Sequence, residues 1–462
     1  MRDHLKEWGL AGAAAIIVVI GAVIDVGARD VSAPDPRAPA GGRFFERAVF
    51  CPPSLPNTKT ILVASATSDA PLTVGVQPTR PEQLDLPPGR VLVQPLADER
   101  AADVVGFGGE VAAGALVRTK KPLVGEGSTQ CSPRAAARWF FGAGASTLGA
   151  DQRMLIYNPF PDEAVVRVMF LTPGGENRKP ALSDLPVPAK SATLVRVNEA
   201  IRLQRSLGAV VEAERGRVVA WRLMFDDAED SPSGVQMSLG VTRSHATWYF
   251  PEGGIGDGMT EHLGIANPST EEATVTVSIV TAERVVQPDS LVEVAIPPRT
   301  SRTLALGVTL PRAQRNLGGA SVIVQSTNNV GVVAERVMRY DTGSISGSAA
   351  EVGTPFLARR WLLTPATLNP STDTVVVMNP GGQEAEISLT FFRSGGRALS
   401  PGAVTERTLG PGGRLKLGLG RWTLGEAVAV MLTSSQPVAA ERFSYSSVPQ
   451  DVGAAMGMVL AE

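Results

Sequence analysis

The sequence predicts an all-β protein: four tandem β-sandwich (Ig-like) repeats of about 105–110 residues that follow an N-terminal transmembrane helix. Three observations carry this prediction. Short Val-rich segments alternate with turn residues, two sets of markers recur at one period, and an uncharged apolar run lies near the N-terminus. The 48 glycines and 35 prolines among 462 residues give frequent turns without the extreme bias of a disordered chain.

The N-terminal prediction rests on residues 8–24, a run without a charged side chain. A bilayer core needs about 20 helical residues, so this run is at the short limit for a membrane span. It also slightly exceeds the apolar region of a cleavable signal peptide, and Val26-Gly27-Ala28 offers a small-residue cleavage site. We favour an uncleaved signal anchor, with residues 1–7 cytoplasmic and the bulk of the chain outside. Cleavage would make the protein secreted, and residues 25–43 form a Pro-rich linker.

Two markers define the repeat. The first is a tryptophan in an aromatic opening run, at Trp139, Trp248 and Trp361. The second is an Asn-Pro turn, at Asn158, Asn267 and Asn379. The two markers advance along the chain by nearly the same interval from one copy to the next, so they share one period. Asparagine forms turns because its side chain caps its own backbone, whereas tryptophans in register indicate packing in a core or between domains.

A closing segment recurs as well. Val333-Ala334-Glu335-Arg336 returns one repeat later as Ala439-Ala440-Glu441-Arg442, while the second unit has Val219-Ala220-Trp221-Arg222 without the glutamate. Neighbouring residues of a strand point to opposite faces, so one of Glu335 and Arg336 is expected to face inward. We interpret the recurrent pairs as buried polar clamps that fix the closing strand. Glu335 and Glu441 occupy equivalent places in different repeats, which argues against a catalytic carboxylate pair.

These markers divide the folded part into four units. Their boundaries are 44–137, 138–246, 247–359 and 360–462. The first unit is divergent, and its segment Pro122-Leu123-Val124-Gly125-Glu126 resembles the closing segment of the fourth. Cys51 and Cys131 bracket this unit, and we predict that they form a disulfide, because an exported chain that keeps two cysteines more often pairs them. Two free thiols are the alternative, and two thiolates without a nearby histidine make a poor zinc site.

A propeller is the competing all-β architecture. Its blades need about 40–50 residues each, and no half-period is found inside a unit. The longer period found here, with about seven strands in each unit, is typical of one sandwich per repeat. We therefore favour sandwiches in tandem.

The repeat motifs also carry a family resemblance. The run Trp248-Tyr249-Phe250-Pro251-Glu252-Gly253, the Asn-Pro turn and Val-Ala-Glu-Arg resemble a repeat of bacterial cell-surface proteins. With the N-terminal anchor, the chain resembles an uncharacterised actinobacterial family of membrane-anchored or secreted proteins that carries the domain-of-unknown-function label 5719. The resemblance covers residues 44–462. It implies a location and an architecture, and it implies no catalytic residue.

Few residues offer reaction chemistry. Of three histidines, His4 is placed in the cytoplasmic tail, and neither His245 nor His262 is accompanied by a nucleophile motif, so we interpret both as surface residues at repeat joints. The acidic segment 226–230 lacks the spacing of a calcium loop and is interpreted as a solvated connector. Trp422 lies outside the repeat pattern and is the best candidate for an exposed contact. We predict no catalytic, cofactor or metal site.

The sequence therefore favours a non-enzymatic structural or interaction protein of the cell envelope. A single-pass anchor would hold it at the cell membrane with its β modules outside. Its partner would be an envelope protein or polysaccharide; the net charge of −2 and the lack of a Lys/Arg cluster argue against nucleic acid. The alternative is a carbohydrate-binding or envelope-polymer-processing protein at the cell wall. An exposed row of aromatics or a cleft with two carboxylates would favour that alternative.

Overall fold

The computed structural model describes residues 46–460 with internal gaps. The gaps are 68–71, 77–84, 88, 97–100, 108–110, 228–232, 282–283, 310–317, 369, 395–397, 403–406, 424–425 and 449. The predicted segments 1–7, 8–24 and 25–43 lie outside the described residues. Within the described part, no helix is long and apolar enough to cross a membrane.

The all-β class is confirmed, and the described chain forms four units, each with two antiparallel sheets that share a core. We call the sheet that reaches the centre of the molecule the axial sheet and the other the second sheet. In unit 1 the axial sheet contains β5 (Val91–Pro95), β2 (Thr58–Ala66), β7 (Val111–Thr119) and β8 (Gly125–Gln130). Its second sheet contains β1 (Glu46–Cys51), β6 (Ala102–Phe107), β3 (Leu72–Val76) and β4 (Asp85–Leu86).

Unit 2 repeats this pattern. Its axial sheet contains β14 (Ser191–Arg196), β10 (Ala150–Asn158), β16 (Val219–Asp226) and β17 (Gly234–Leu239). Its second sheet contains β12 (Gly175–Arg178), β11 (Ala164–Thr172), β15 (Gly208–Arg215) and β9 (Arg138–Phe141), with β13 (Leu185–Val187) paired to β11. Short helical turns η1 (Pro180–Leu182) and α2 (Val197–Ala200) connect the strands.

Unit 3 has the same plan. Its axial sheet contains β24 (Thr300–Ala305), β20 (Met259–Asn267), β27 (Val333–Asp341) and β28 (Ser346–Val352). Its second sheet contains β18 (Thr247–Phe250), β26 (Ser321–Ser326), β21 (Ala273–Val280), β22 (Val285–Val286) and β23 (Val294–Ile296). A separate pair, β19 (Gly254–Ile255) with β25 (Gly318–Gly319), and the turns η2 (Asp289–Leu291) and α3 (Leu306–Thr309) complete it.

In unit 4 one long strand, β34 (Val428–Ser447), belongs to both sheets. Its second half pairs with β30 (Thr372–Asn379) and β35 (Gln450–Met456), and β33 (Gly413–Gly418) pairs with β30. Its first half pairs with β29 (Ala358–Leu363) and β31 (Ala385–Arg393), next to β32 (Arg407–Leu409) and β36 (Met458–Val459). The short helix α4 (Gly420–Thr423) follows β33.

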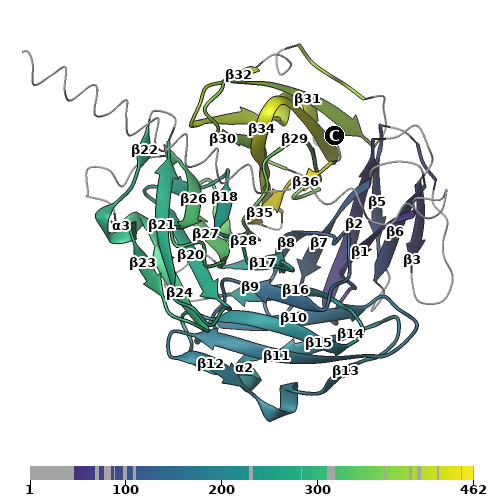
Figure 1. Cartoon of the computed structure of the whole chain (residues 1–462). Helices are drawn as coiled ribbons and strands as arrows, with labels where there is room; N and C mark the ends of the chain where they lie inside the picture. The colour runs from purple at the N-terminus through teal and green to yellow at the C-terminus, as the bar shows by residue number, and fades with distance from the viewer. Residues whose placement is uncertain are drawn as a thin grey trace, which may run out of the picture.

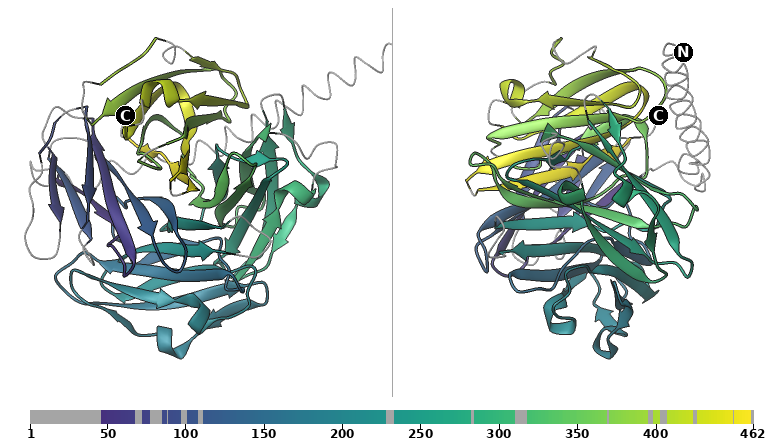
Figure 2. Two further views of the ribbon diagram at one scale, coloured as in Figure 1. Left: turned by 180° about the vertical axis from the view of Figure 1, so that it is seen from behind. Right: turned by 90° about the vertical axis from the view of Figure 1, so that its left-hand side faces the viewer.

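The four units close into a ring (Figures 1 and 2). The innermost strands β8, β17, β28 and β35 lie at the centre, where β17 and β35 each contact both β8 and β28. Unit 1 meets unit 4 through an apolar cluster. This cluster includes Ile61, Val63 and Leu116 of unit 1 and Leu362, Phe392 and Ala429 of unit 4. The tandem prediction did not include this closure.

The repeat markers occupy equivalent places. Trp139, Trp248 and Trp361 are buried, and their indole N–H groups donate to the carbonyls of Val218, Val332 and Val438 at 2.7, 2.8 and 2.9 Å. Asn158, Asn267 and Asn379 are also buried, and each donates to a carbonyl four residues ahead at 2.7 Å and accepts from the N–H two residues ahead. Each side chain therefore closes the same turn.

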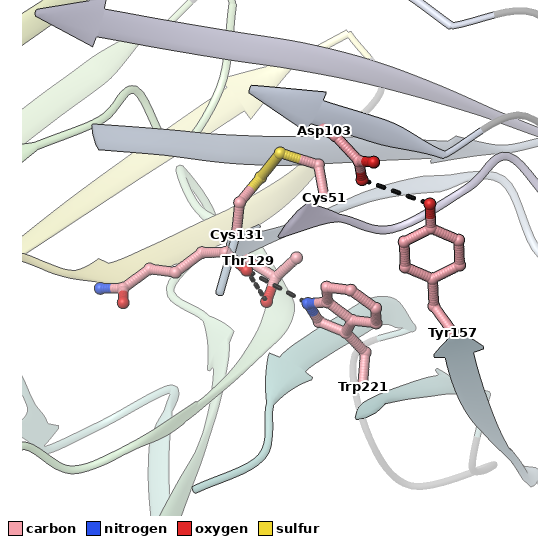
Figure 3. The surroundings of a disulfide bond; sticks show 7 residues. Cys51, Asp103, Thr129, Cys131, Tyr157 and Trp221 are labelled. Atoms are coloured by element: carbon pink, nitrogen blue, oxygen red, sulfur yellow. Dashed lines mark hydrogen bonds between the residues drawn. A yellow bond between two sulfur atoms is a disulfide. The ribbon is translucent and has the colours of Figure 1, made fainter. Parts of the chain in front are cut away.

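The predicted disulfide between Cys51 and Cys131 is confirmed. Cys51 ends β1 in the second sheet and Cys131 follows β8 of the axial sheet, so the bond joins the two sheets of unit 1 (Figure 3). The interpretation of residues 122–126 as a closing segment is wrong. They lie in the hairpin between β7 and β8, and β7 has the register of the closing strands, because it pairs with both β2 and the axial strand β8.

Candidate functional site

The joint between units 2 and 3 is built around Glu335 of β27. Its carboxylate accepts from the backbone N–H groups of Gly142 and Ala143 at 3.1 and 2.9 Å and from Ser238 Oγ at 2.6 Å. It also pairs with the guanidinium of Arg222, and both side chains are fully buried. All four partners belong to unit 2. Glu335 is therefore a clamp, as predicted, but it acts between units.

The neighbouring residue Arg336 is buried as well, although only one of the two was expected to face inward. The outer face of this axial sheet packs against the preceding unit, so both faces of β27 are buried around Glu335 and Arg336. Arg336 pairs with Glu441 of unit 4, and Glu441 also accepts from the backbone N–H of Glu252 at 3.0 Å. The same clamp thus joins units 3 and 4.

The joint between units 1 and 2 is different (Figure 3). Trp221 occupies the place of the glutamate, and its indole N–H donates to the carbonyl of Gln130 in unit 1 at 3.2 Å. Tyr157 donates its hydroxyl proton to Asp103 of unit 1 at 3.2 Å, and Lys190 lies 3.8 Å from the same carboxylate. Burial raises the pKa of Asp103 to about 6, against the opposing effects of Lys190 and Tyr157.

Arg442 of unit 4 has no glutamate of a following unit to pair with. Its guanidinium instead binds Asp373 of the same unit, with Nε 2.8 Å from Oδ1, and the carbonyl of Val428. In unit 1, Gly114 occupies the strand position that Glu335 occupies in unit 3. A Cβ added to Gly114 would lie 2.6 Å from Thr364 Oγ1 of unit 4. At this place the last joint therefore has close packing instead of an ion pair.

Asp451 lies at the centre of the ring. Its carboxylate accepts backbone hydrogen bonds from Glu126 of unit 1, Val235 of unit 2, Ser348 of unit 3 and Val452 of its own unit, at 3.1, 2.9, 3.2 and 2.9 Å. One side chain thus binds all four units. Burial raises the pKa of Asp451 to about 8, while these four N–H groups act to lower it.

Three glycines make room for Asp451. They are Gly125, Gly234 and Gly347, each directly before a donating residue. A Cβ added to Gly125 or Gly347 would lie 2.6 Å from an Asp451 oxygen, and one added to Gly234 would lie 3.0 Å from it. The innermost strands of units 1, 2 and 3 therefore each have a glycine where the side chain of Asp451, from unit 4, needs space.

Glu261 and Glu351 are buried acids outside the clamp pairs. Arg222, Arg336 and Arg442 are matched by Glu335, Glu441 and Asp373. Glu261 lies 3.9 Å from Arg336, and burial raises its pKa to about 7, with the charges of Glu252 and Glu441 adding to the rise and Arg336 opposing it. Burial also raises the pKa of Glu351 well above its usual value. Both acids are therefore kept neutral more readily than a surface glutamate.

The other sequence candidates lie apart from these joints. His245 and His262 are half-buried, which corrects their interpretation as surface residues: His245 packs edge-on against Trp248, and burial lowers the pKa of both. His4 lies outside the described residues. Asp226 is buried and bound to Arg339, so it is not part of a solvated connector; residues 228–230 lie outside the described chain. No cluster suited to a metal ion occurs among the described residues.

Trp422 was predicted as an exposed contact. It is half-buried and stacks on Phe391 at 5.7 Å between ring centroids, and it packs against the core of unit 4. The guanidinium of Arg421 lies 5.4 Å from its ring centroid. Part of the indole stays accessible, but core packing accounts for most of its surroundings.

An open groove runs along the edge of the second sheet of unit 2 and reaches unit 3 at Pro268, Ser269 and Arg299. It consists of two adjoining hollows of about 420 and 340 Å³, both lined by Arg138 and Glu212. Arg138 Nε donates to Glu212 Oε1 at 2.8 Å, and Arg299 of unit 3 reaches Glu176 of unit 2 at 2.7 Å. Hydrogen bonds from Arg178 and Arg299 lower the pKa of Glu176, although partial burial opposes this effect.

The groove carries an excess of positive charge. Its lining includes five arginines, Arg134, Arg138, Arg178, Arg243 and Arg299, and two glutamates. Arg134 and Arg243 are exposed and form no ion pair within the described part of the chain. The next joint has no such set, because Thr247 pairs with Gln325 where Arg138 pairs with Glu212, and Gly412 replaces Arg299.

Comparison with known proteins places the chain in a family. A model described as a family of unknown function (DUF5719) matches residues 108–247 and 242–442, and the chain belongs to this family. The expected membership of the family with the label 5719 is thereby confirmed. A similarity to the crystal structure of Thermotoga maritima 1070 covers 22% of this chain and 95% of that chain, at 19% sequence identity and a TM-score of 0.20. No curated protein matches the chain.

Sequence reasoning missed Asp451, the axial glycines and the groove. Arg222 was identified only as the neighbour of a lost glutamate. A signal existed for the glycines, because the spacing between Gly234 and Gly347 is close to the repeat period. It was indistinct among the 48 glycines of the chain.

Proposed function

We propose that this protein is a non-enzymatic structural or interaction protein of the cell envelope, anchored to the membrane by residues 8–24 and holding its β units outside. The observation that carries the proposal is the use of the buried acids: Glu335 and Glu441 in the clamps and Asp451 at the centre all bind a neighbouring unit. These groups therefore serve to hold the four units together as one rigid ring. A rigid ring suits a scaffold.

The extracytoplasmic placement is supported by the disulfide between Cys51 and Cys131, because such bonds persist in oxidising compartments. The placement predicts that the protein remains with membranes after a high-pH wash, and that protease added to intact spheroplasts degrades residues 46–460. Recovery of the whole chain in the soluble cytoplasm would contradict the proposal.

The contact surface of the scaffold, on this proposal, is the arginine groove along the edge of unit 2. The three recurrent tryptophans are buried, so they supply no sugar-binding row, which weakens the alternative of a carbohydrate-binding protein. Exposed guanidinium groups bind carboxylates and phosphates in a bidentate manner. The partner that the groove fits is therefore an acidic segment of an envelope protein.

The test compares the full chain with a variant carrying Arg134→Glu, Arg138→Glu and Arg243→Glu. We expect wild type to retain an envelope component in a salt-sensitive manner and the variant to lose it. Arg215→Glu, an exposed arginine of unit 2 paired with Glu163 and absent from the groove lining, is the matched control. Equal retention by all three proteins would exclude the groove, and retention of a neutral glycan would favour the alternative.

A further inference from the structure

Two exposed leucines lie on adjoining loops of unit 2. Leu148 is 89% exposed and Leu203 is 71% exposed. Backbone hydrogen bonds from Leu203 N–H to the carbonyl of Ser146 at 2.9 Å, and from Ser146 N–H to the carbonyl of Gln204 at 2.8 Å, tie the two loops together. The two leucines therefore lie on one structural tip, which these hydrogen bonds hold together.

The fold does not require leucine at either place. Leu203 has a φ of 59°, a left-handed conformation that is unfavourable for a residue with a Cβ. Leu148 precedes Gly149, whose φ is 81°, and in unit 3 the same turn has the exposed Asp257 before Gly258 at 71°. A polar residue thus serves the same turn, so packing does not explain the apolar side chains.

The tip itself, residues 146–149 and 202–205, carries only positive charge. Arg202 and Arg205 flank Leu203 and are exposed, and residues 201–208 contain no acid. The loop of residues 143–149 has no charged residue. The nearest acids along the chain are Asp151, which pairs with Arg153 at 2.6 Å, and Glu199, which lies 3.4 Å from Arg196. Asp227 is exposed, and its backbone N–H donates to the carbonyl of Gly149 at 2.6 Å. A surface with exposed leucines beside arginines inserts into the headgroup region of an anionic membrane, with its arginines at the lipid phosphates.

We propose that this tip, formed by residues 146–149 and 202–205, is a second membrane contact of the protein, which inserts Leu148 and Leu203 into the interface of a bilayer containing anionic lipid. The contact is independent of the groove and of the N-terminal anchor. It would hold the ring at a defined orientation to the membrane, with unit 2 nearest the lipid.

The test uses the full chain reconstituted in vesicles, with an environment-sensitive fluorophore on a single introduced cysteine. Both native cysteines form the disulfide, so Leu203→Cys provides the reactive thiol and Leu148→Cys a second site should the first variant fold poorly. Val448→Cys and Val124→Cys, 77% and 64% exposed, are matched controls on other hairpins. All four proteins carry the same N-terminal segment, so anchoring alone affects them alike.

In vesicles of phosphatidylcholine with phosphatidylglycerol, we expect fluorescence at positions 203 and 148 to shift to the blue. A lipid-attached quencher should quench it at least about twofold more than at the controls. Adding Arg202→Glu and Arg205→Glu, or omitting phosphatidylglycerol, should abolish the difference. Equal quenching at positions 203, 148, 448 and 124, or quenching at the tip that is the same in neutral vesicles, would overturn the proposal.

Discussion

Glu335 of unit 3 and Arg222 of unit 2 form an ion pair in which both side chains are fully buried. The residues occupy nearly the same place in successive closing strands, so one repeat supplies the acid and the preceding repeat supplies the base. Arg336 and Glu441 repeat the relationship one unit later. A motif that belongs to each copy thus becomes complete only where two copies meet.

The first prediction concerns removal of this acid. Glu335→Ala leaves the guanidinium of Arg222 buried without its carboxylate and two N–H groups without their acceptor. We expect a loss of about 3–5 kcal/mol in the free energy of unfolding, as for other broken buried pairs. Chemical denaturation of the full chain measures it.

The control is Glu163→Ala, which breaks an exposed pair with Arg215. Exposed pairs contribute little, so the stability should change by no more than about 1 kcal/mol. Adding Arg222→Met to Glu335→Ala should recover part of the loss, because the unpaired charge is removed. A loss of the same size for both alanine variants would show that the clamp has no special role.

The second prediction concerns the centre of the ring. Asp451→Ala removes the acceptor of four backbone N–H groups, each of which costs roughly 1–3 kcal/mol when it is buried without a partner. We expect a lower melting temperature and faster hydrogen exchange at the amides of Glu126, Val235 and Ser348. These amides lie in three other units. Exchange that changes only in the immediate neighbourhood of the substituted position would contradict a role in joining the units.

These relationships mark the limit of what the sequence could predict. The tryptophan, the Asn-Pro turn and Glu335 were found because each is a distinctive residue that recurs in register. The ring was not found, because its contacts join residues that share no local pattern: Asp451 binds a backbone N–H 325 residues away. Backbone donors cannot be recognised from a sequence. The groove could not be predicted from the repeat either, because it consists of side chains that differ between copies.

The third prediction tests the space around Asp451. In Gly347→Ala the new Cβ would lie 2.6 Å from Asp451 Oδ1 at a backbone φ of 146°, so both packing and conformation oppose it. We expect a loss of at least about 2 kcal/mol. Gly382→Ala, where nothing lies within 4 Å of the added atom, is the control and should change the unfolding free energy by less than about 0.5 kcal/mol. Similar values for the two variants would contradict a crowded axis.

The fourth prediction concerns the disulfide. Cys51 and Cys131 are 80 positions apart, and a bond that closes a loop of this size restricts the unfolded chain by roughly 4 kcal/mol. We expect the double variant Cys51→Ala and Cys131→Ala to unfold at lower denaturant concentration, with unit 1 exchanging its amides first. An unchanged midpoint, with wild type shown to be oxidised, would contradict this role.

The last prediction follows from the buried acids. Burial raises the pKa of Glu261 to about 7 and of Asp451 to about 8, from ordinary values of 4.5 and 3.8. At a pH between the ordinary and the raised pKa of each acid, the folded protein binds more protons than the unfolded chain. Raising the pH through this interval therefore favours unfolding. Stability should therefore fall as the pH rises from about 5 to about 8. Glu261→Gln keeps an acceptor for the N–H of Gly254 but cannot ionise, so melting curves of this variant should depend less steeply on pH. Melting temperatures that rise over this range, or an equally steep dependence in the variant, would contradict the assignment.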